Sequence, residues 1–206
     1  MGILIVISPL IVLLILRIRL NMSSKDKNDE IMEEFWARER EARFARNVDI
    51  SNLPLFIPDM ECLPFLPSSD DKRRSELEAK VISSGREPML DLHEFTNTDL
   101  KIKYGNGNFT TISSYDQNFM YFTRDLFQWG KYLYENNYTD DALTVLEYLI
   151  SITQNIVSAF TILAKIYRDN KEPDKISNLI NIVESTKDSI TKQTTLRSLR
   201  DIINSY

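Results

Sequence analysis

The sequence predicts an all-α protein, in which a single N-terminal transmembrane helix precedes a helical domain that ends in two helical hairpins and a capping helix. Three observations lead to this prediction. The chain starts with a long apolar run, and apolar side chains recur at helical spacing through much of the remainder. In addition, two stretches near the C-terminus match each other at one constant offset along the chain.

The composition limits the classes of function. The 206 residues are 43% hydrophobic and 27% charged, which is typical of a globular protein and excludes bulk disorder. A net charge of −5 argues against nucleic acid as a partner, because nucleic-acid-binding domains carry a basic face. The single cysteine, Cys62, has no second cysteine with which to form an intramolecular disulfide.

The predicted membrane anchor covers residues 3–20. The segment from Ile3 to Leu16 has no charged side chain, and only Arg17 and Arg19 interrupt the apolar character before Leu20. As a helix the anchor would be about 27 Å long, close to the roughly 30 Å hydrocarbon core, with the arginines reaching the interface. A cleaved signal peptide would need preceding basic residues and a following small-x-small site. A helix lying in the membrane interface is a further alternative.

The charges beside the anchor predict its orientation. Four basic residues follow the apolar run, namely Arg17, Arg19, Lys25 and Lys27, whereas no basic side chain precedes it. By the positive-inside rule, we expect a single-pass protein of the cell membrane with its soluble domain in the cytoplasm.

Residues 21–114 are predicted to hold a juxtamembrane helix, a proline-rich strap and short helices. The juxtamembrane helix, Glu30 to Arg46, carries a partial apolar stripe of Ile31, Phe35 and Trp36, which fits either a docking helix beside the membrane or a solvated spacer. Two shorter helical stretches are expected from Asp70 to Ser83 and from Leu90 to Tyr104, the latter closed by a Gly-Asn turn.

The strap runs from Leu53 to Pro67. Its four prolines exclude both a helix and a central strand, yet its large apolar side chains are too many for a free linker. We therefore expect an extended segment that buries its apolar side chains, including Cys62, against the helical domain. The alternative is a proline-rich ligand for a separate protein.

Residues 115–206 are predicted to form the repeat domain. Seven pairs of positions share one separation along the chain, which we call the repeat interval: Leu126, Trp129, Gly130, Leu133, Ala142, Leu146 and Leu149 match Phe160, Leu163, Ala164, Tyr167, Ile176, Ile180 and Val183. Each set follows the spacing of one helix face. Ser114 with Gln117 predicts the start of the first helix, and Pro173 suits the first turn of the fourth. Residues Ser185 to Tyr206 continue the helical period outside the repeat and predict the capping helix.

The stretch from Tyr115 to Glu184 resembles two tetratricopeptide repeats, because the repeat interval equals the period of that family, about 34 residues. It departs from the family pattern, because Leu126 and Trp129 stand where the family has Trp and Leu, and Ile176 replaces a small residue. The whole chain is also similar to a family of uncharacterised N-terminally membrane-anchored proteins of anaerobic Gram-positive bacteria. The segments FWARER, DISNLP, NTDLKIKYG and YDQNF carry this second resemblance, which implies no known activity.

The tetratricopeptide resemblance implies a peptide-binding groove lined by the first helix of each hairpin. The corresponding residues are Arg124, Phe127, Lys131, Tyr134, Ser158, Thr161, Lys165 and Arg168. Two basic side chains per helix suit an acidic peptide or a C-terminal carboxylate. Alternatively, these are solvated positions that Glu135 and Asp169 neutralise.

The expected function is that of a membrane-anchored cytoplasmic adaptor or scaffold that binds an unidentified protein or acidic peptide. The alternative is a structural subunit of a membrane protein complex, packed permanently against a companion. We do not expect an enzyme, a cofactor or a metal site, because the sequence contains no phosphate-binding glycine-rich loop, no Cys/His cluster and no nucleophile elbow.

Overall fold

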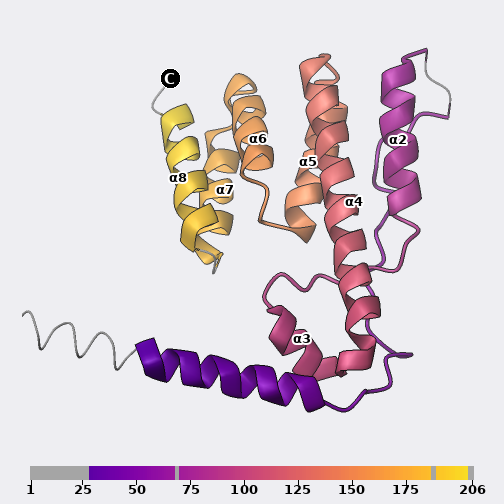
Figure 1. Cartoon of the computed structure of the whole chain (residues 1–206). Helices are drawn as coiled ribbons and strands as arrows, with labels where there is room; N and C mark the ends of the chain where they lie inside the picture. The colour runs from indigo at the N-terminus through magenta and orange to yellow at the C-terminus, as the bar shows by residue number, and fades with distance from the viewer. Residues whose placement is uncertain (1–27, 68–69, 187–188, 204–206) are drawn as a thin grey trace, which may run out of the picture. The chain divides into compact units, whose positions relative to one another are not determined.

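A computed structural model describes residues 28–67, 70–186 and 189–203 of the chain (Figure 1). In this part of the chain the regular elements are helices, beside one isolated antiparallel bridge between Phe56 and Met89, so the predicted all-α class is confirmed. The first helix covers residues 28–44. It is followed by α2 (Lys72–Ser84), α3 (Asn97–Tyr104), the 3₁₀ turn η1 (Asn106–Asn108), α4 (Phe109–Glu135), α5 (Thr139–Ile152), α6 (Val157–Asp169), α7 (Pro173–Ser185) and α8 (Ser189–Ile203).

The predicted anchor, residues 3–20, lies outside the described residues. Within the described residues, no helix combines the length and the apolar character that crossing a bilayer requires.

The chain forms two compact units. The described residues up to Leu53 belong with Leu92–Ile112 in the first unit, and Pro54–Asp91 belongs with the chain from Ser113 onward in the second. Helix α4 begins in the first unit and continues through the second.

In the first unit, the C-terminal half of the first helix packs against α3. Arg38 forms an ion pair with Asp99, the Thr98 hydroxyl donates a hydrogen bond to Glu39, and Ala42 is fully buried. Helix α3 is shorter than predicted and begins at Asn97 instead of Leu90. The reason is a capping box, in which the Thr96 side chain accepts from the Asp99 N–H and the Asp99 side chain accepts from the Thr96 N–H.

The predicted Gly-Asn turn after α3 is present. Gly105 has φ +90°, and a Cβ there would lie 2.4 Å from the Cα of Asn47, so only glycine fits. The Asn47 side chain accepts a hydrogen bond from the Gly107 N–H at 2.8 Å, and the Asn108 side chain donates to the Val48 carbonyl at 2.6 Å. These bonds hold the segment after the first helix against the turn.

In the second unit, α2 is joined to its surroundings by a buried charged cluster. Arg74 is 1% exposed. Its guanidinium lies 2.8 Å from Glu78 on the same helix and 2.8 Å from Asp141 at the start of α5, and it donates to the Pro64 carbonyl at 3.0 Å. One side chain therefore connects α2, the strap and α5.

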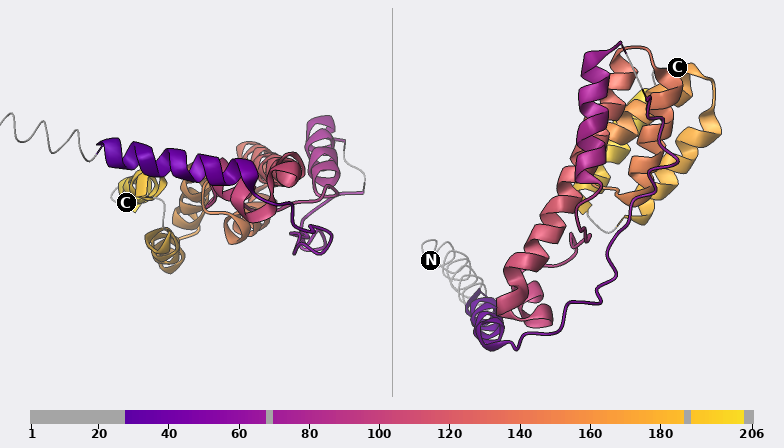
Figure 2. Two further views of the ribbon diagram at one scale, coloured as in Figure 1. Left: turned by 60° about the horizontal axis from the view of Figure 1, so that its bottom comes forward. Right: turned by 90° about the vertical axis from the view of Figure 1, so that its right-hand side faces the viewer.

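The strap packs along α4 and α5 and is extended apart from a turn at residues 61–63 (Figure 2). The Phe65 ring stacks on Trp129 with centroids 4.9 Å apart, and Phe56 meets Phe119 edge-on at 5.3 Å. The Asp59 N–H donates a hydrogen bond to the Tyr148 hydroxyl at 2.9 Å. The apolar contacts expected of the strap are therefore made through its aromatic side chains and through Leu63, which is buried in the core.

Other strap residues face solvent, because successive side chains of an extended segment point to opposite sides. Leu55, Ile57 and Leu66 are exposed, Ile57 to 85%. The predicted burial of Cys62 is wrong: the residue is exposed, and its thiol donates to the Asp59 carbonyl at 3.1 Å.

Helices α4 with α5 and α6 with α7 form two successive hairpins. Of the residues in the seven matching pairs, Ile180 is half-buried and all the others are buried. Trp129 and Leu163 are both completely buried. The stripes that define the repeat interval in the sequence are therefore the faces that form the core.

The two hairpins also share the geometry of their turns. Helix α4 ends at Glu135 and α6 at Asp169, while α5 begins at Thr139 and α7 at Pro173. In both turns the last helical carbonyls are satisfied in the same way. The Tyr138 N–H donates to Leu133 O at 2.9 Å, and the Glu172 N–H donates to Tyr167 O at 2.8 Å. Each of these positions in the first hairpin is separated from its counterpart in the second by the repeat interval.

One end of the repeat region differs from expectation, and the other end agrees with it. Helix α4 begins at Phe109 and runs unbroken through Ser114, so the predicted start at Ser114 is wrong. The fully buried Ile112 extends the apolar stripe of the helix upstream. At the other end, α8 packs against α6 and α7 and buries Leu199 and Ile202, as expected of a capping helix.

Candidate functional site

The predicted groove residues lie on α4 and α6, two helices that belong to one row of neighbouring helices. In Figure 1, α2 lies on one side of α4, and α6 and α8 follow on the other side. The Tyr132 hydroxyl of α4 hydrogen-bonds to Asp71, the N-cap residue of α2, and α6 packs directly against α8. Arg124, Phe127, Lys131 and Tyr134 follow one another along α4, one per turn.

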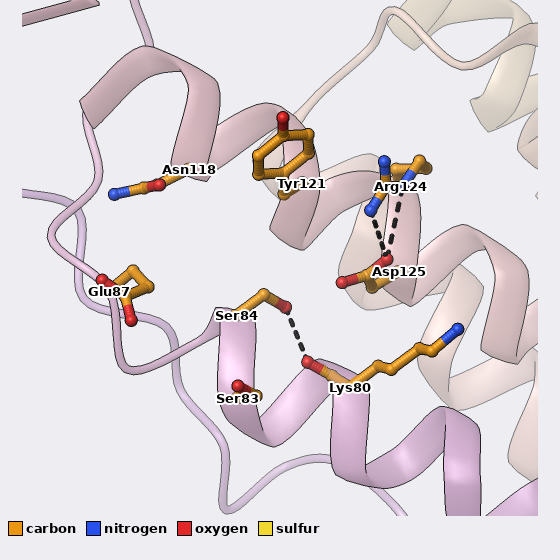
Figure 3. A pocket seen from close by; sticks show the side chains of 8 residues that line it. All are labelled: Lys80, Ser83, Ser84, Glu87, Asn118, Tyr121, Arg124 and Asp125. Atoms are coloured by element: carbon orange, nitrogen blue, oxygen red, sulfur yellow. Dashed lines mark hydrogen bonds and ion pairs between the residues drawn. The ribbon is translucent and has the colours of Figure 1, made fainter. Parts of the chain in front are cut away.

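The α4 residues of the predicted groove border three surface depressions. The Arg124 depression has a volume of about 300 Å³ and lies between α2 and α4 (Figure 3). It is lined by Lys80, Ser83, Ser84, Glu87, Asn118, Tyr121, Arg124 and Asp125. Figure 3 shows the four α4 side chains on one side of it and the α2 side chains with Glu87 on the other.

The side chains of the Arg124 depression are held by local contacts. The Arg124 guanidinium lies 4.8 Å from the centre of the Tyr121 ring and donates to Asp125 at 3.1 Å. The Asn118 amide donates to the Pro88 carbonyl at 3.0 Å, which fixes the chain that leads from α2 to α4. The depression therefore offers two cations, hydroxyl groups and carboxylates at the surface.

The Lys131 depression lies further along the same two helices and has a volume of about 200 Å³. It is lined by Arg73, Leu77, Phe127, Gln128, Lys131, Tyr132 and Glu135. The Tyr132 hydroxyl lies 2.9 Å from both carboxylate oxygens of Asp71. This hydrogen bond raises the pKa of the Tyr132 phenol, so the hydroxyl stays protonated and acts as a donor.

A third depression joins the turns of the two hairpins. It has a volume of about 450 Å³ and is lined by Tyr134, Glu135, Asn137, Thr139, Ile166, Asp169 and Asn170. Tyr134 is the predicted groove residue that reaches the second hairpin here. The lining carries two carboxylates and no basic side chain, so this depression does not suit an acidic ligand.

The basic residues of the predicted groove have acidic neighbours. Lys131 lies 3.6 Å from Glu135, and Arg168 lies 3.0 Å from Asp169, the two pairs expected if these positions are merely solvated. The exposed Lys131–Glu135 pair contributes only about 0–1 kcal/mol.

The four α6 positions do not line the three depressions described above. Ser158 is exposed, and the Thr161 hydroxyl donates to the Val157 carbonyl of its own helix at 3.1 Å. Lys165 and Arg168 are half-buried. Three α4 residues of the predicted groove, Arg124, Phe127 and Lys131, therefore line depressions shared with α2, whereas Tyr134 lines one shared with α6.

The contribution of α2 was missed in the sequence. Arg73, Leu77, Lys80 and Ser84 line the two depressions beside α4. Their spacing of four, three and four residues defines one helix face, which is the signal that could have identified them. Because α2 lies outside the repeated hairpins, no matching position pointed to it.

Comparison of the chain with protein-family models, with curated proteins and with solved structures gave no match.

Proposed function

We propose that the protein is a membrane-anchored cytoplasmic adaptor, or scaffold, that binds a protein partner on the face shared by α2, α4 and α6. The observation that carries this proposal is the recurrence of one helical hairpin, with the same buried positions and the same turn, after the repeat interval. We infer that the hairpins are tetratricopeptide-like repeats, because the repeat interval matches the period of about 34 residues that is characteristic of that family.

Stacked helical hairpins support a binding function for a physical reason. Each hairpin buries one face against its neighbours, and the outer sides of the stacked helices form a continuous surface that accepts extended or helical peptides. In this chain α8 closes one end of the stack. At α4 the surface is widened by α2, which adds the Arg124 and Lys131 depressions.

The chemistry of these two depressions favours an acidic peptide. Together the Arg124 and Lys131 depressions form a furrow between α2 and α4. Four cations line this furrow, namely Arg73, Lys80, Arg124 and Lys131. Lys131 pairs with Glu135, an exposed carboxylate on the same helix, whereas Arg124 pairs with Asp125, whose side chain is 12% exposed. A carboxylate of a bound peptide replaces the exposed Lys131–Glu135 pair at little cost. Tyr121 and Phe127 add apolar surface next to the charges.

The proposed location at the membrane rests on residues 3–20 and on the basic residues that follow them. In this arrangement the anchor concentrates the bound partner at the cytoplasmic surface.

The proposal is tested by purifying the intact chain from native membranes in mild detergent and measuring its co-purifying protein. Arg124→Glu combined with Lys131→Glu reverses two charges in the furrow and is expected to release the partner. Lys72→Glu is the matched control, since Lys72 is exposed at the start of α2 and lines neither furrow depression.

Equal recovery with all variants would contradict binding at this face. A companion that all variants retain in stoichiometric amount, with aggregation of the chain once they are separated, would favour the structural-subunit alternative.

A further inference from the structure

The first helix carries an apolar stripe that the structure leaves uncovered. Ile31, Met32, Phe35 and Trp36 are exposed by 54%, 49%, 48% and 53% respectively. They recur at the spacing of one helix face, and the rings of Phe35 and Trp36 meet edge-on with centroids 5.3 Å apart. Four large apolar side chains in less than two turns form the densest exposed apolar surface among the described residues of the first unit.

The stripe continues an interface that already exists. In the C-terminal half of the same helix, Ala42 is fully buried and Glu39 bonds to Thr98 of α3. At 100° per residue, Ala42 and Glu39 lie on the same side as Ile31 and Phe35. The second half of the helix therefore contacts α3, whereas the apolar face of the first half lies beyond this contact.

The position of the stripe in the chain indicates what covers it. Only residues 21–27 separate the helix from Leu20, the end of the predicted anchor. The eight links from Leu20 to Asn28 reach at most roughly 28 Å, even when fully extended. The stripe is therefore tethered close to the bilayer surface, where tryptophan and phenylalanine are favoured in the interfacial layer.

The charges of the first helix indicate what kind of surface covers the stripe. Residues 28–44 contain six carboxylates against three arginines, a net charge of −3. Glu30, Glu33 and Glu41 lie on the side opposite the stripe. An acidic helix gains nothing from anionic headgroups, so its membrane contact has to come from apolar burial.

We infer that the first helix lies in the membrane interface, with Ile31, Met32, Phe35 and Trp36 inserted among the lipids and its acidic side facing the cytoplasm. The contact is apolar in origin and requires no anionic lipid. This inference rests on the proposed anchor, and it adds that the soluble part is held at a defined depth and orientation instead of on a free tether.

The test uses the full chain with Cys62→Ser, carrying one spin label and reconstituted into phosphatidylcholine vesicles. The label is placed at Met32→Cys on the stripe or at Glu30→Cys on the acidic side. Both positions are exposed, so neither substitution disturbs the core. At position 32 the label is expected to lose collisions with a water-soluble nickel complex and to gain collisions with oxygen. At position 30 it is expected to remain accessible to nickel.

A second variant tests whether the aromatic side chains of the stripe cause the insertion. In the chain labelled at position 32, Phe35→Gln with Trp36→Gln is expected to return the label to water while the chain still floats with the vesicles. Addition of phosphatidylserine is expected not to increase the insertion of the stripe.

Other outcomes would overturn the inference in distinguishable ways. A chain that does not float with vesicles contradicts the anchor itself. A floating chain whose position 32 is as accessible to nickel as position 30 contradicts interfacial insertion alone. Shielding from both nickel and oxygen would place the stripe against protein, and spin–spin broadening would identify that protein as a second copy. Insertion that appears only with phosphatidylserine would contradict its apolar origin.

Discussion

Asn137 and Lys171 hold the same left-handed backbone conformation, with φ of 64° and 60°, at equivalent points of the two hairpin turns. Glycine is the residue that most often occupies this position after a helix, because an L side chain is strained there. Asparagine tolerates the conformation better than lysine does. One turn geometry is thus maintained by two different residues, of which lysine is the less suited.

Replacing Lys171 by glycine is therefore expected to stabilise the protein. Removing the side chain relieves the left-handed strain, and we expect a gain of about 0.5–1 kcal/mol in the free energy of unfolding, with a smaller gain for Asn137→Gly. Urea denaturation of the detergent-solubilised chain, followed by circular dichroism, measures both. Lys171→Ala is the control, because alanine keeps the strain, and an equal gain with alanine would refute the explanation.

Gly130 is expected to resist substitution even by alanine. A Cβ at this position would lie 2.7 Å from Cδ2 and 2.9 Å from Cγ of Leu146, which is completely buried. Overpacking costs about 1–3 kcal/mol and the better helix propensity returns up to about 1 kcal/mol, so Gly130→Ala is expected to lose about 1 kcal/mol.

A double-mutant cycle with Leu146→Ala checks this cause. The Gly130→Ala loss should disappear when Leu146 is shortened, because the added methyl group then has space. A loss of the same size in both backgrounds would show that the close approach of α4 and α5 is not its origin.

The buried Arg74 is expected to be intolerant of single substitution. Arg74→Ala leaves the Glu78 carboxylate, which is 5% exposed, without its cation, and is expected to cost about 3–5 kcal/mol. Arg74→Met with Glu78→Met removes both charges and should cost less than Arg74→Ala alone. A double variant at least as unstable as the single one would contradict the electrostatic explanation. Urea midpoints of the natural chain and both variants at pH 7 supply the comparison.

Asp71 is expected to make the stability of the second unit sensitive to acid. The backbone N–H of Arg74 donates to its carboxylate and lowers its pKa below the ordinary value, and the Tyr132 hydroxyl acts in the same direction. A carboxyl group with a lowered folded-state pKa contributes stability above its unfolded pKa of about 3.9, and this contribution is lost as the pH falls through the folded value.

Asp71→Asn keeps a side chain that caps a helix but cannot ionise. The variant is therefore expected to show a smaller fall in urea midpoint between pH 5 and pH 3 than the natural chain. Asp70→Asn, one residue earlier and exposed, is the control and should retain the full acid sensitivity. Equal acid sensitivity of the natural chain and the Asp71 variant would show that this carboxyl group is not responsible.

The sequence was sufficient for the parts of the fold that depend on local periodicity. Buried positions such as Trp129 and Leu163 could be predicted from two signals that agree. The two residues are separated by the repeat interval, and each lies at helical spacing from other apolar residues. Pro173 was expected in the first turn of a helix and begins α7, because its fixed φ and missing N–H suit that position.

Features that depend on distant contacts were not predictable. The sequence predicts that Cys62 is buried because its neighbours are apolar, but Cys62 lies in a turn of the strap, in which the Leu63 N–H donates to the Met60 carbonyl, and this turn leaves the thiol exposed. The contact of α2 with α4 involves the hydrogen bond from the Tyr132 hydroxyl to Asp71, two residues that are far apart in sequence and part of no repeat. The furrow beside α4, which includes three of the eight expected groove residues, could therefore not be inferred.

Site-specific photo-crosslinking of the intact chain in native membranes tests the binding face most directly. A benzophenone amino acid at Gln128, an exposed residue of the Lys131 depression, is expected to give one discrete adduct that Arg124→Glu with Lys131→Glu abolishes. The same amino acid at Asn178, exposed on α7, is expected to give none. Absence of an adduct from Gln128, or an equal adduct from Asn178, would contradict a partner bound along α2, α4 and α6.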